Sequence, residues 1–262
     1  MIVRADPCST ETGQASPVED TVHAGGLSCP VSVRTSELTI AGLSSLSTCD
    51  WPGKLVATVF LQGCPWRCTY CHNPALLDPI APGQVAWQQA RDLLLRRRGL
   101  LDGMVFSGGE PTRQSGLPTA MREVRELGFG VGLHTGGAYP SRLAELLPLV
   151  DWVGLDIKAL PEEYHRITGV RASGVKAFAS LDQLVASGVD HEVRITVDPT
   201  VHTAGHLDRL VGRVRAYGAQ KIVLQEARPQ GVRAEYAARL AGRRLRDVVR
   251  SQPVGATLRT GG

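Results

Sequence analysis

The sequence predicts an α/β fold built on a parallel sheet. From about residue 38 onward, short apolar segments alternate with longer amphipathic ones, giving six strand–helix units in order. The apolar segments suit strands that are covered on both faces and joined by right-handed helical crossovers. Chemically distinctive residues follow four successive strand ends, where parallel folds place their active sites. This convergence favours a partial (β/α)6 TIM-like barrel over an open doubly wound sheet.

Each unit pairs a strand of four to seven residues with a longer amphipathic segment. Residues 55–61 read Leu-Val-Ala-Thr-Val-Phe-Leu, an apolar run of strand length, and Gly128 follows a helical segment as a C-terminal glycine does. The strands are expected at 55–61, 104–107, 131–134, 152–157, 193–197 and 222–225. The helices are expected at 85–98, 118–127, 141–147, 175–187, 206–217 and 234–249.

The N-terminal part differs in composition from the rest. Residues 1–35 are rich in Pro, Ser, Thr, Gly and Glu and have no helical or strand period, so they are expected to form a flexible tail. Residues 36–262 are expected to form one domain, because 262 residues with 43% hydrophobic composition allow one sizeable core. Cys8 and Cys29 lie in the tail and are interpreted as free thiols.

Charge and hydropathy exclude several classes of protein. The formal net charge is only +4, without the concentrated basic patch of nucleic-acid-binding proteins. No apolar run approaches the ~18–20 residues of a membrane span, and the N-terminus lacks the basic start and apolar region of a secretory signal. The protein is therefore expected in the cytoplasm, where clustered cysteines bind metal more often than they form disulfides.

Three cysteines within eight residues carry the main chemical signal. Cys64, Cys68 and Cys71 have the spacing C-x3-C-x2-C. Their soft thiolates suit an iron–sulfur cluster, and three of them leave the fourth iron of a cubane open to a small molecule. A structural zinc site is the alternative, with His72 as fourth ligand, but adjacent side chains rarely converge on one tetrahedral ion. A disulfide would leave one cysteine unpaired.

This spacing, with Tyr70 just before the third cysteine, resembles the radical S-adenosylmethionine (SAM) superfamily. Phe106–Thr112 contains Gly-Gly-Glu-Pro and resembles the glycine-rich motif of that family. Asp156-Ile157-Lys158 and the segment 51–74 resemble the activating enzymes of glycyl radical enzymes, especially those of anaerobic ribonucleotide reductase and pyruvate formate-lyase. The likeness covers roughly residues 38–230.

The resemblance implies a radical SAM barrel with a [4Fe–4S] cluster on Cys64, Cys68 and Cys71. It implies SAM contacts from Tyr70, His72, Gly108, Gly109, Glu110, Asp156 and Lys158, and it assigns no further catalytic side chain. The two glycines would let the backbone approach the ligand, and Glu110 would face its ammonium group. The implied partners are a glycyl radical enzyme of the anaerobic ribonucleotide reductase type and a flavodoxin or ferredoxin-type electron donor. Neither nucleic acid nor membrane is implied.

The sequence departs from the activating enzymes at two strand ends. His134-Thr135-Gly136-Gly137 stands where many have Asp-Thr-Asn-Gly, so a bound monovalent cation is not expected, and His134 is interpreted as a packed strand residue. No histidine follows strand 222–225, which leaves the ribose contact there unassigned. Arg194 is interpreted either as a cofactor contact or as an ion-pair partner of a helix. His202 and His206 are expected at the surface or at a helix cap.

The absence of cysteines after residue 71 excludes a C-terminal auxiliary cluster and favours a single-cluster enzyme. Two alternatives to an activating enzyme remain. One is a single-cluster radical SAM enzyme that acts on a small molecule, and the other is a non-catalytic zinc-binding module. Iron and zinc content distinguishes the latter from both enzymes.

Overall fold

The computed structural model describes residues 38–249 and 255–259. Contacts divide the chain into Met1–Ser32 and Val33–Gly262, and every described residue belongs to the second unit. The flexible tail expected at residues 1–35, with Cys8 and Cys29, lies outside the described residues and stays a prediction. Across the described part of the chain, no helix has the length and apolar character of a membrane span.

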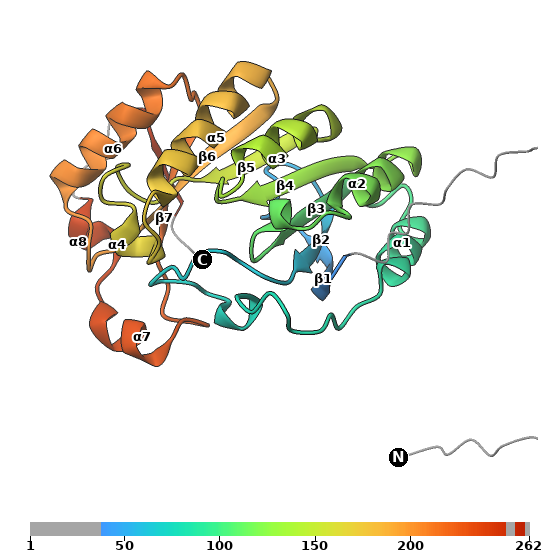
Figure 1. Ribbon diagram of the computed structural model, residues 1–262, viewed down its shortest axis with the longest axis horizontal. Coiled ribbons are helices and arrows are strands. Elements are labelled where there is room, and N and C mark those ends of the chain that lie inside the picture. The colour runs from blue at the N-terminus through green and yellow to red at the C-terminus, as the bar shows by residue number, and fades with distance from the viewer. Residues whose placement is uncertain (1–37, 250–254, 260–262) are drawn as a thin grey trace, which may run out of the picture. The chain divides into compact units, whose positions relative to one another are not determined.

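One eight-stranded sheet organises the described residues, and its strands are neighbours in sequence order (Figure 1). The strands are β1(Ile40–Ser47), β2(Val56–Leu61), β3(Gly103–Gly108), β4(Gly130–Thr135), β5(Trp152–Asp156), β6(Asp190–Val197), β7(Ile222–Glu226) and β8(Thr257–Arg259). The strands β2 to β8 run parallel, and β1 is antiparallel to β2. The predicted partial barrel is confirmed: its six strands are β2 to β7, and the sheet stays open between β1 and β8.

Helices follow the strands as the sequence predicts, with one correction and with the short helix α4 as an unexpected addition. They are α1(Trp87–Arg96), α2(Leu117–Glu126), α3(Pro140–Leu146), α4(His165–Thr168), α5(Ser173–Ser187), α6(Ala204–Ala216), α7(Ala234–Leu240) and α8(Leu245–Val248). The single helix expected at 234–249 is wrong. Ala241 and Gly242 adopt left-handed backbone angles, with φ of 47° and 75°, and they end α7 before α8 begins.

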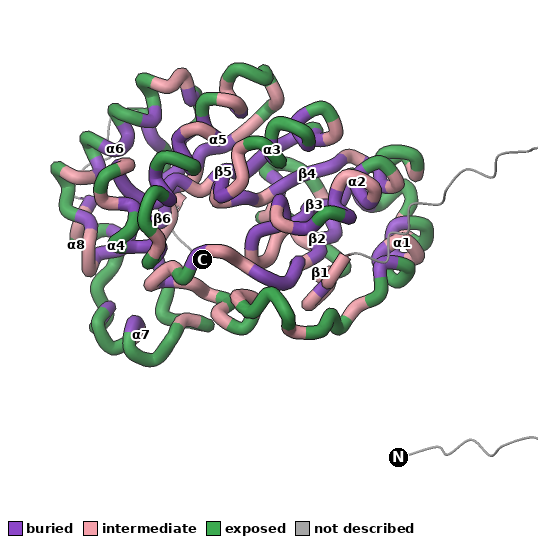
Figure 2. Tube along the Cα trace, viewed as in Figure 1, coloured by how far each residue is buried: buried purple, intermediate pink, exposed green. Residues whose placement is uncertain are grey.

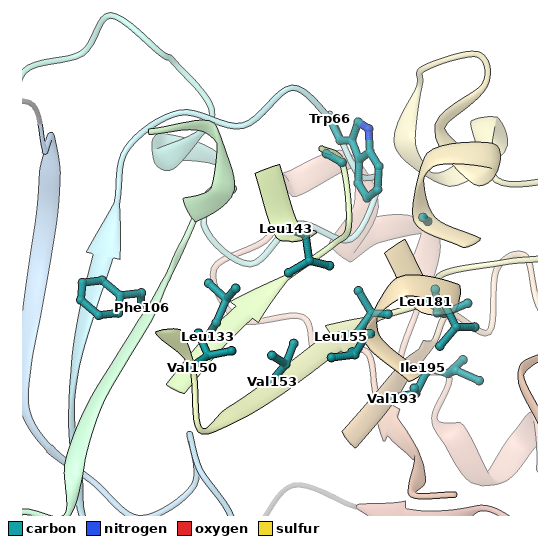
Figure 3. Packing of buried hydrophobic residues seen from close by; sticks show 14 of the residues in the cluster. Trp66, Phe106, Leu133, Leu143, Val150, Val153, Leu155, Leu181, Val193 and Ile195 are labelled. Carbon is teal, nitrogen blue, oxygen red and sulfur yellow. The ribbon is translucent and has the colours of Figure 1, made fainter. Parts of the chain in front are cut away.

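The hydrophobic core lies between the outer face of the sheet and the helices. The helices α2, α3, α5 and α6 run along that face (Figure 1), and the tube is buried mainly along the strands and the inner sides of the helices (Figure 2). Leu133, Val153, Leu155 and Ile195 pack there with Leu181 of α5 (Figure 3). Apolar burial of this extent is the main force that holds the strands in place.

The inner face of the sheet is different. It is polar toward the carboxyl ends of the strands and aromatic toward their amino ends. Thr58 of β2 donates to Asp50, and on β6 Arg194 donates to Asp156. At the amino ends of the strands, Trp51 and Trp152 stack with their ring centres 5.8 Å apart, and they form a small separate core with two valines. The strands are thus buried on both faces but apolar mainly on the outer one.

Candidate functional site

A cavity of about 210 Å³ lies at the carboxyl ends of the parallel strands. Its wall contains all ten residues that the sequence singled out: Cys64, Cys68, Cys71, Tyr70, His72, Gly108, Gly109, Glu110, Asp156 and Lys158. Gly136, Thr196 and Gln225 add the ends of β4, β6 and β7 to the same wall. All six strands of the predicted barrel therefore contribute to one site.

Hydrogen bonds hold the loop that carries the cysteines against neighbouring segments of the chain. Backbone N–H groups of Arg67 and Thr69 donate to carbonyl oxygens of α4, at 2.9 and 3.0 Å. His72 Nδ1 lies 3.1 Å from the carbonyl oxygen of Gln230, in the segment after β7. Gly63 begins the loop, and its N–H donates to the carbonyl oxygen of Leu76 at 2.9 Å. These bonds fix the backbone of a loop that has no regular secondary structure between β2 and Pro74.

The three thiols face the cavity as free cysteines. Burial raises the pKa of Cys64 to about 12 and also raises the pKa of Cys68. Thiolate ligands must lose their protons, so a cluster that binds here displaces protons from the loop. Among the described residues, no three His, Cys, Asp or Glu side chains converge as the ligands of a single ion do.

Glu110 enters the cavity in a fixed orientation. Its side chain is 1% exposed, and its Oε1 accepts from the hydroxyl groups of Thr112 and Thr135 at 2.6 and 2.7 Å. Its Oε2 accepts one hydrogen bond from the described residues, from the N–H of Gly136 at 2.9 Å. A carboxylate oxygen accepts more than one hydrogen bond, so Oε2 retains capacity for a donor that enters the cavity.

Gly108 and Gly109 line the cavity, but their first role is to let two chain segments meet. A Cβ on Gly109 would lie 2.4 Å from the carbonyl oxygen of Gly63, and a Cβ on Gly108 would lie 2.3 Å from the backbone nitrogen of Leu61. Gly108 also has a φ of 114°. The close approach that the sequence assigned to a ligand is therefore made to the cysteine loop and to β2.

Asp156 and Lys158 form the charged wall of the cavity. Lys158 Nζ lies 3.5 Å from Asp156 Oδ2 and 5.7 Å from the ring centre of Tyr70. Burial disfavours the charge on Lys158, yet nearby acidic groups, Asp156 among them, hold its pKa well above the usual value. Burial likewise opposes the charge on Asp156, but Arg194 and then Lys158 outweigh it and lower the pKa of that carboxyl. Both groups are therefore charged near neutral pH.

Arg194 is the nearest partner of Asp156, with Nε 2.9 Å from Oδ1. It does not line the cavity. Its partner is thus a neighbouring strand, not a helix as one interpretation of the sequence expected.

Two buried side chains, whose role here the sequence did not indicate, hold this strand end. The hydroxyl of Tyr164 donates to the carbonyl oxygen of Asp156 and accepts from the N–H of Lys158, both at 3.2 Å. His202 Nδ1 accepts from the N–H of Asp198, so its Nε2 donates to the carbonyl oxygen of Lys158, at 3.0 Å. His202 is 6% exposed, so the expected surface or capping role is wrong for this residue.

The glycines after β4 also have a role that the sequence did not reveal. A Cβ on Gly136 would lie 2.7 Å from the indole of Trp66, which occupies the cysteine loop between the first two thiols. His134, at the end of the same strand, is packed as expected: its Nε2 lies 2.6 Å from the carbonyl oxygen of Asp50, and its ring meets Trp152 edge-on. Burial, and after it Arg194, lowers the pKa of His134 to about 4.

The residues of the cavity fit the two groups that the sequence implies. Three thiols from one loop match a cluster with one iron left open, and Glu110 and Lys158 offer opposite charges to the ammonium and carboxylate of an amino acid.

Comparisons with known proteins agree with this chemistry. Residues 58–210 match the model of the Radical SAM superfamily. A relative from Methanocaldococcus jannaschii, whose name assigns it provisionally to the glycyl-radical enzyme activating enzymes, is 32% identical over 62% of this chain and 69% of its own. The pyruvate formate-lyase-activating enzyme of Clostridium pasteurianum is 31% identical, with the same coverage.

Among solved structures, Streptococcus suis SuiB bound to S-adenosylmethionine superposes with a TM-score of 0.54 at 12% identity, over 77% of this chain. This chain spans about half, 48%, of the length of SuiB, and the likeness concerns the fold. Enzymes of the superfamily use a [4Fe–4S] cluster and SAM. The chain belongs to the radical SAM superfamily and, within it, to the family of glycyl-radical enzyme activating enzymes.

Proposed function

We propose that this protein removes a hydrogen atom from a glycine of a partner enzyme and so installs a glycyl radical there. The observation that carries the proposal is that three thiols, the Gly-Gly-Glu turn and the Asp156–Lys158 pair line a single cavity. The net reaction consumes one electron and one SAM. It yields methionine, 5′-deoxyadenosine and a radical on the Cα of the glycine.

The side chains divide the work of binding. Cys64, Cys68 and Cys71 would hold three irons, Glu110 would accept from the ammonium of SAM, and Lys158 would pair with its carboxylate. When bound, the cluster and SAM together supply a carbon-centred radical that abstracts hydrogen. Asp156 would face the ribose while its charge holds Lys158 in place. Glu110 and Lys158 are buried, which limits the access of water to the two charges that would hold SAM.

The partner is proposed at two levels. A glycyl radical enzyme is the class that the two activating-enzyme relatives support. Within that class, the resemblance of the sequence motifs taken together favours an anaerobic ribonucleotide reductase, whereas the name of the clostridial relative points to pyruvate formate-lyase. A flavodoxin or a ferredoxin-type protein is the proposed electron donor.

The test uses the full chain, reconstituted with iron and sulfide under anaerobic conditions. The protein is mixed with SAM, a photochemical reductant and either candidate partner, and the products are 5′-deoxyadenosine and an electron paramagnetic resonance signal of a glycyl radical. We expect both products in equal amounts with the true partner. Release of 5′-deoxyadenosine without a glycyl radical on either partner would reject the activating role.

Single cysteine variants separate the cluster site from the rest of the chain. Cys64→Ala, Cys68→Ala and Cys71→Ala are each expected to lose the cluster and all cleavage of SAM. Cys49→Ala is the matched control, because Cys49 is exposed and lies outside the cavity. A cluster that survives the loss of any one of the three thiols would contradict the assignment.

A further inference from the structure

A second hollow, of about 360 Å³, lies beside the loop that carries the cysteines. We call it the arginine hollow, and it is lined by Thr39, Arg113, Gln114, Ser115, Tyr139 and Arg142. It contains two arginines and no acidic residue. Arg113 is half-buried and Arg142 is exposed, so both guanidinium groups are within reach of a partner.

Among the residues that the structure describes, no carboxylate pairs with either guanidinium group. Arg142 donates to the carbonyl oxygens of Thr112 and Arg113, and its guanidinium lies 5.5 Å from the ring centre of Tyr139. Glu145 borders an adjoining cavity with Arg142 without pairing to it. The arginine hollow therefore presents a positive surface.

This positive surface touches the cysteine loop itself. A Cβ on Gly63, the residue before Cys64, would lie 3.1 Å from Arg113 Nη1 and 3.1 Å from Pro79 Cα. The charge of the hollow also acts on Tyr139: burial raises the pKa of its hydroxyl, and the positive charges of Arg113 and Arg142 oppose that shift. A partner seated in the hollow is thus next to a cluster ligand without entering the cavity assigned to SAM.

An exposed apolar side chain lies in the segment that, like Arg113, borders Gly63. Ile80 follows Pro79 and is 87% exposed, the highest exposure among the large hydrophobic residues that the structure describes. An apolar anchor beside arginine and tyrosine is a composition found at the centres of protein interfaces. The hollow and Ile80 together have the chemistry of a surface for a protein partner.

We infer that the arginine hollow and Ile80 form the docking surface for the acidic protein that delivers the electron. The inference rests on the proposed function, since a redox cluster must receive its electron from outside the chain. The donor loses one electron and the cluster gains it, and no covalent bond changes. Complementary charge steers such an encounter and speeds association, and salt weakens it.

The experiment compares two reductants on the full, cluster-loaded chain. One is a flavodoxin kept reduced by its reductase and NADPH, and the other is a light-activated deazaflavin, which is a small molecule and needs no docking surface. The variants are Arg113→Glu and Ile80→Asn. Arg213→Glu is the matched control, because Arg213 is exposed on α6 and carries the same charge change away from the hollow.

At low salt and limiting flavodoxin, Arg113→Glu is expected to form 5′-deoxyadenosine about tenfold more slowly than the wild type. Ile80→Asn is expected to be slower as well, Arg213→Glu unchanged, and the deficit of Arg113→Glu to shrink as salt is raised. With deazaflavin, all four proteins should react equally.

Three results would overturn the inference. Equal flavodoxin-driven rates for Arg113→Glu and Arg213→Glu would do so while leaving the proposed function intact. An equal loss with both reductants would place Arg113 in support of the cysteine loop. A normal yield of 5′-deoxyadenosine with less glycyl radical would assign the hollow to the radical-accepting partner. Failure of the wild type with deazaflavin would instead reject the proposed function.

Discussion

The substitution Tyr164→Phe, which removes only the hydroxyl group, is expected to lower the free energy of unfolding by about 2 kcal/mol. The ring is fully buried, and Phe would keep its packing, including the edge-on contact with Trp66 at 5.7 Å. Only the two hydrogen bonds to Asp156 and Lys158, both 3.2 Å long, are lost. Each bond contributes about 1 kcal/mol, and without them a half-buried carbonyl and a buried N–H lose their partner.

Urea unfolding of the metal-free protein under reducing conditions measures this loss. With an m-value of about 3 kcal/mol/M, a loss of about 2 kcal/mol moves the midpoint down by about 0.7 M. Tyr217→Phe is the matched control, because the ring of Tyr217 packs on Phe178 while its hydroxyl makes no hydrogen bond with the described residues. If both variants unfold at the same urea concentration, the claim that Tyr164 holds this strand end is refuted.

Substitutions at three other positions test further parts of the structure. Gly109→Ala should lower the free energy of unfolding by about 3 kcal/mol, because its Cβ would overlap backbone atoms. Gly212 lies inside α6 with open space around it, so Gly212→Ala should raise that free energy by about 1 kcal/mol. Thermal unfolding measures both changes. Asp156→Asn should lower the free energy of unfolding, measured in urea, by about 3 kcal/mol, because it leaves two buried cations unpaired. Asp190→Asn breaks an exposed ion pair and should lower it by under about 1 kcal/mol. Burial and then Arg194 lower the pKa of His134 to about 4, so below about pH 6.5 the unfolded chain binds a proton that the native state does not. The free energy of unfolding should therefore decrease as the pH is lowered from about 6.5 to about 4. His134→Asn should remove that part of the slope, and parallel pH curves for the two proteins would contradict this account.

The parts of the fold that the sequence predicted well are those with strong local periodicity. The six parallel strands and their helices follow from apolar runs such as residues 56–61 and from the amphipathic segments between them. The edge strand β1 was missed because its sequence, Ile-Ala-Gly-Leu-Ser-Ser-Leu-Ser, is small and polar, and its pairing with β2 defines it. The break after α7 was missed because Ala241, a strong helix former, adopts a left-handed conformation.

The candidate site divides in the same way. Its ten predicted residues belong to three short motifs at the ends of β2, β3 and β5. Their convergence on one cavity follows from the topology of a parallel barrel. Tyr164 and His202 could not be found from the sequence, because each acts through a backbone atom of another segment. For His202 that atom is 44 residues away along the chain. The contact of Gly136 with Trp66 could not be found from the sequence either, since only the fold brings the two residues together.

The stacked indoles of Trp51 and Trp152 fill the lower end of the barrel, where glycines at 130 and 132 leave room for Trp51. Dioxygen, which degrades iron–sulfur clusters, therefore meets packed side chains at this end of the described barrel. Under the proposed function, a partner enzyme seated at the opposite end, over the carboxyl ends of the strands, would shield the cavity from solvent while its glycine reacts. Binding of the partner and protection of the cluster from dioxygen would then be two effects of one contact.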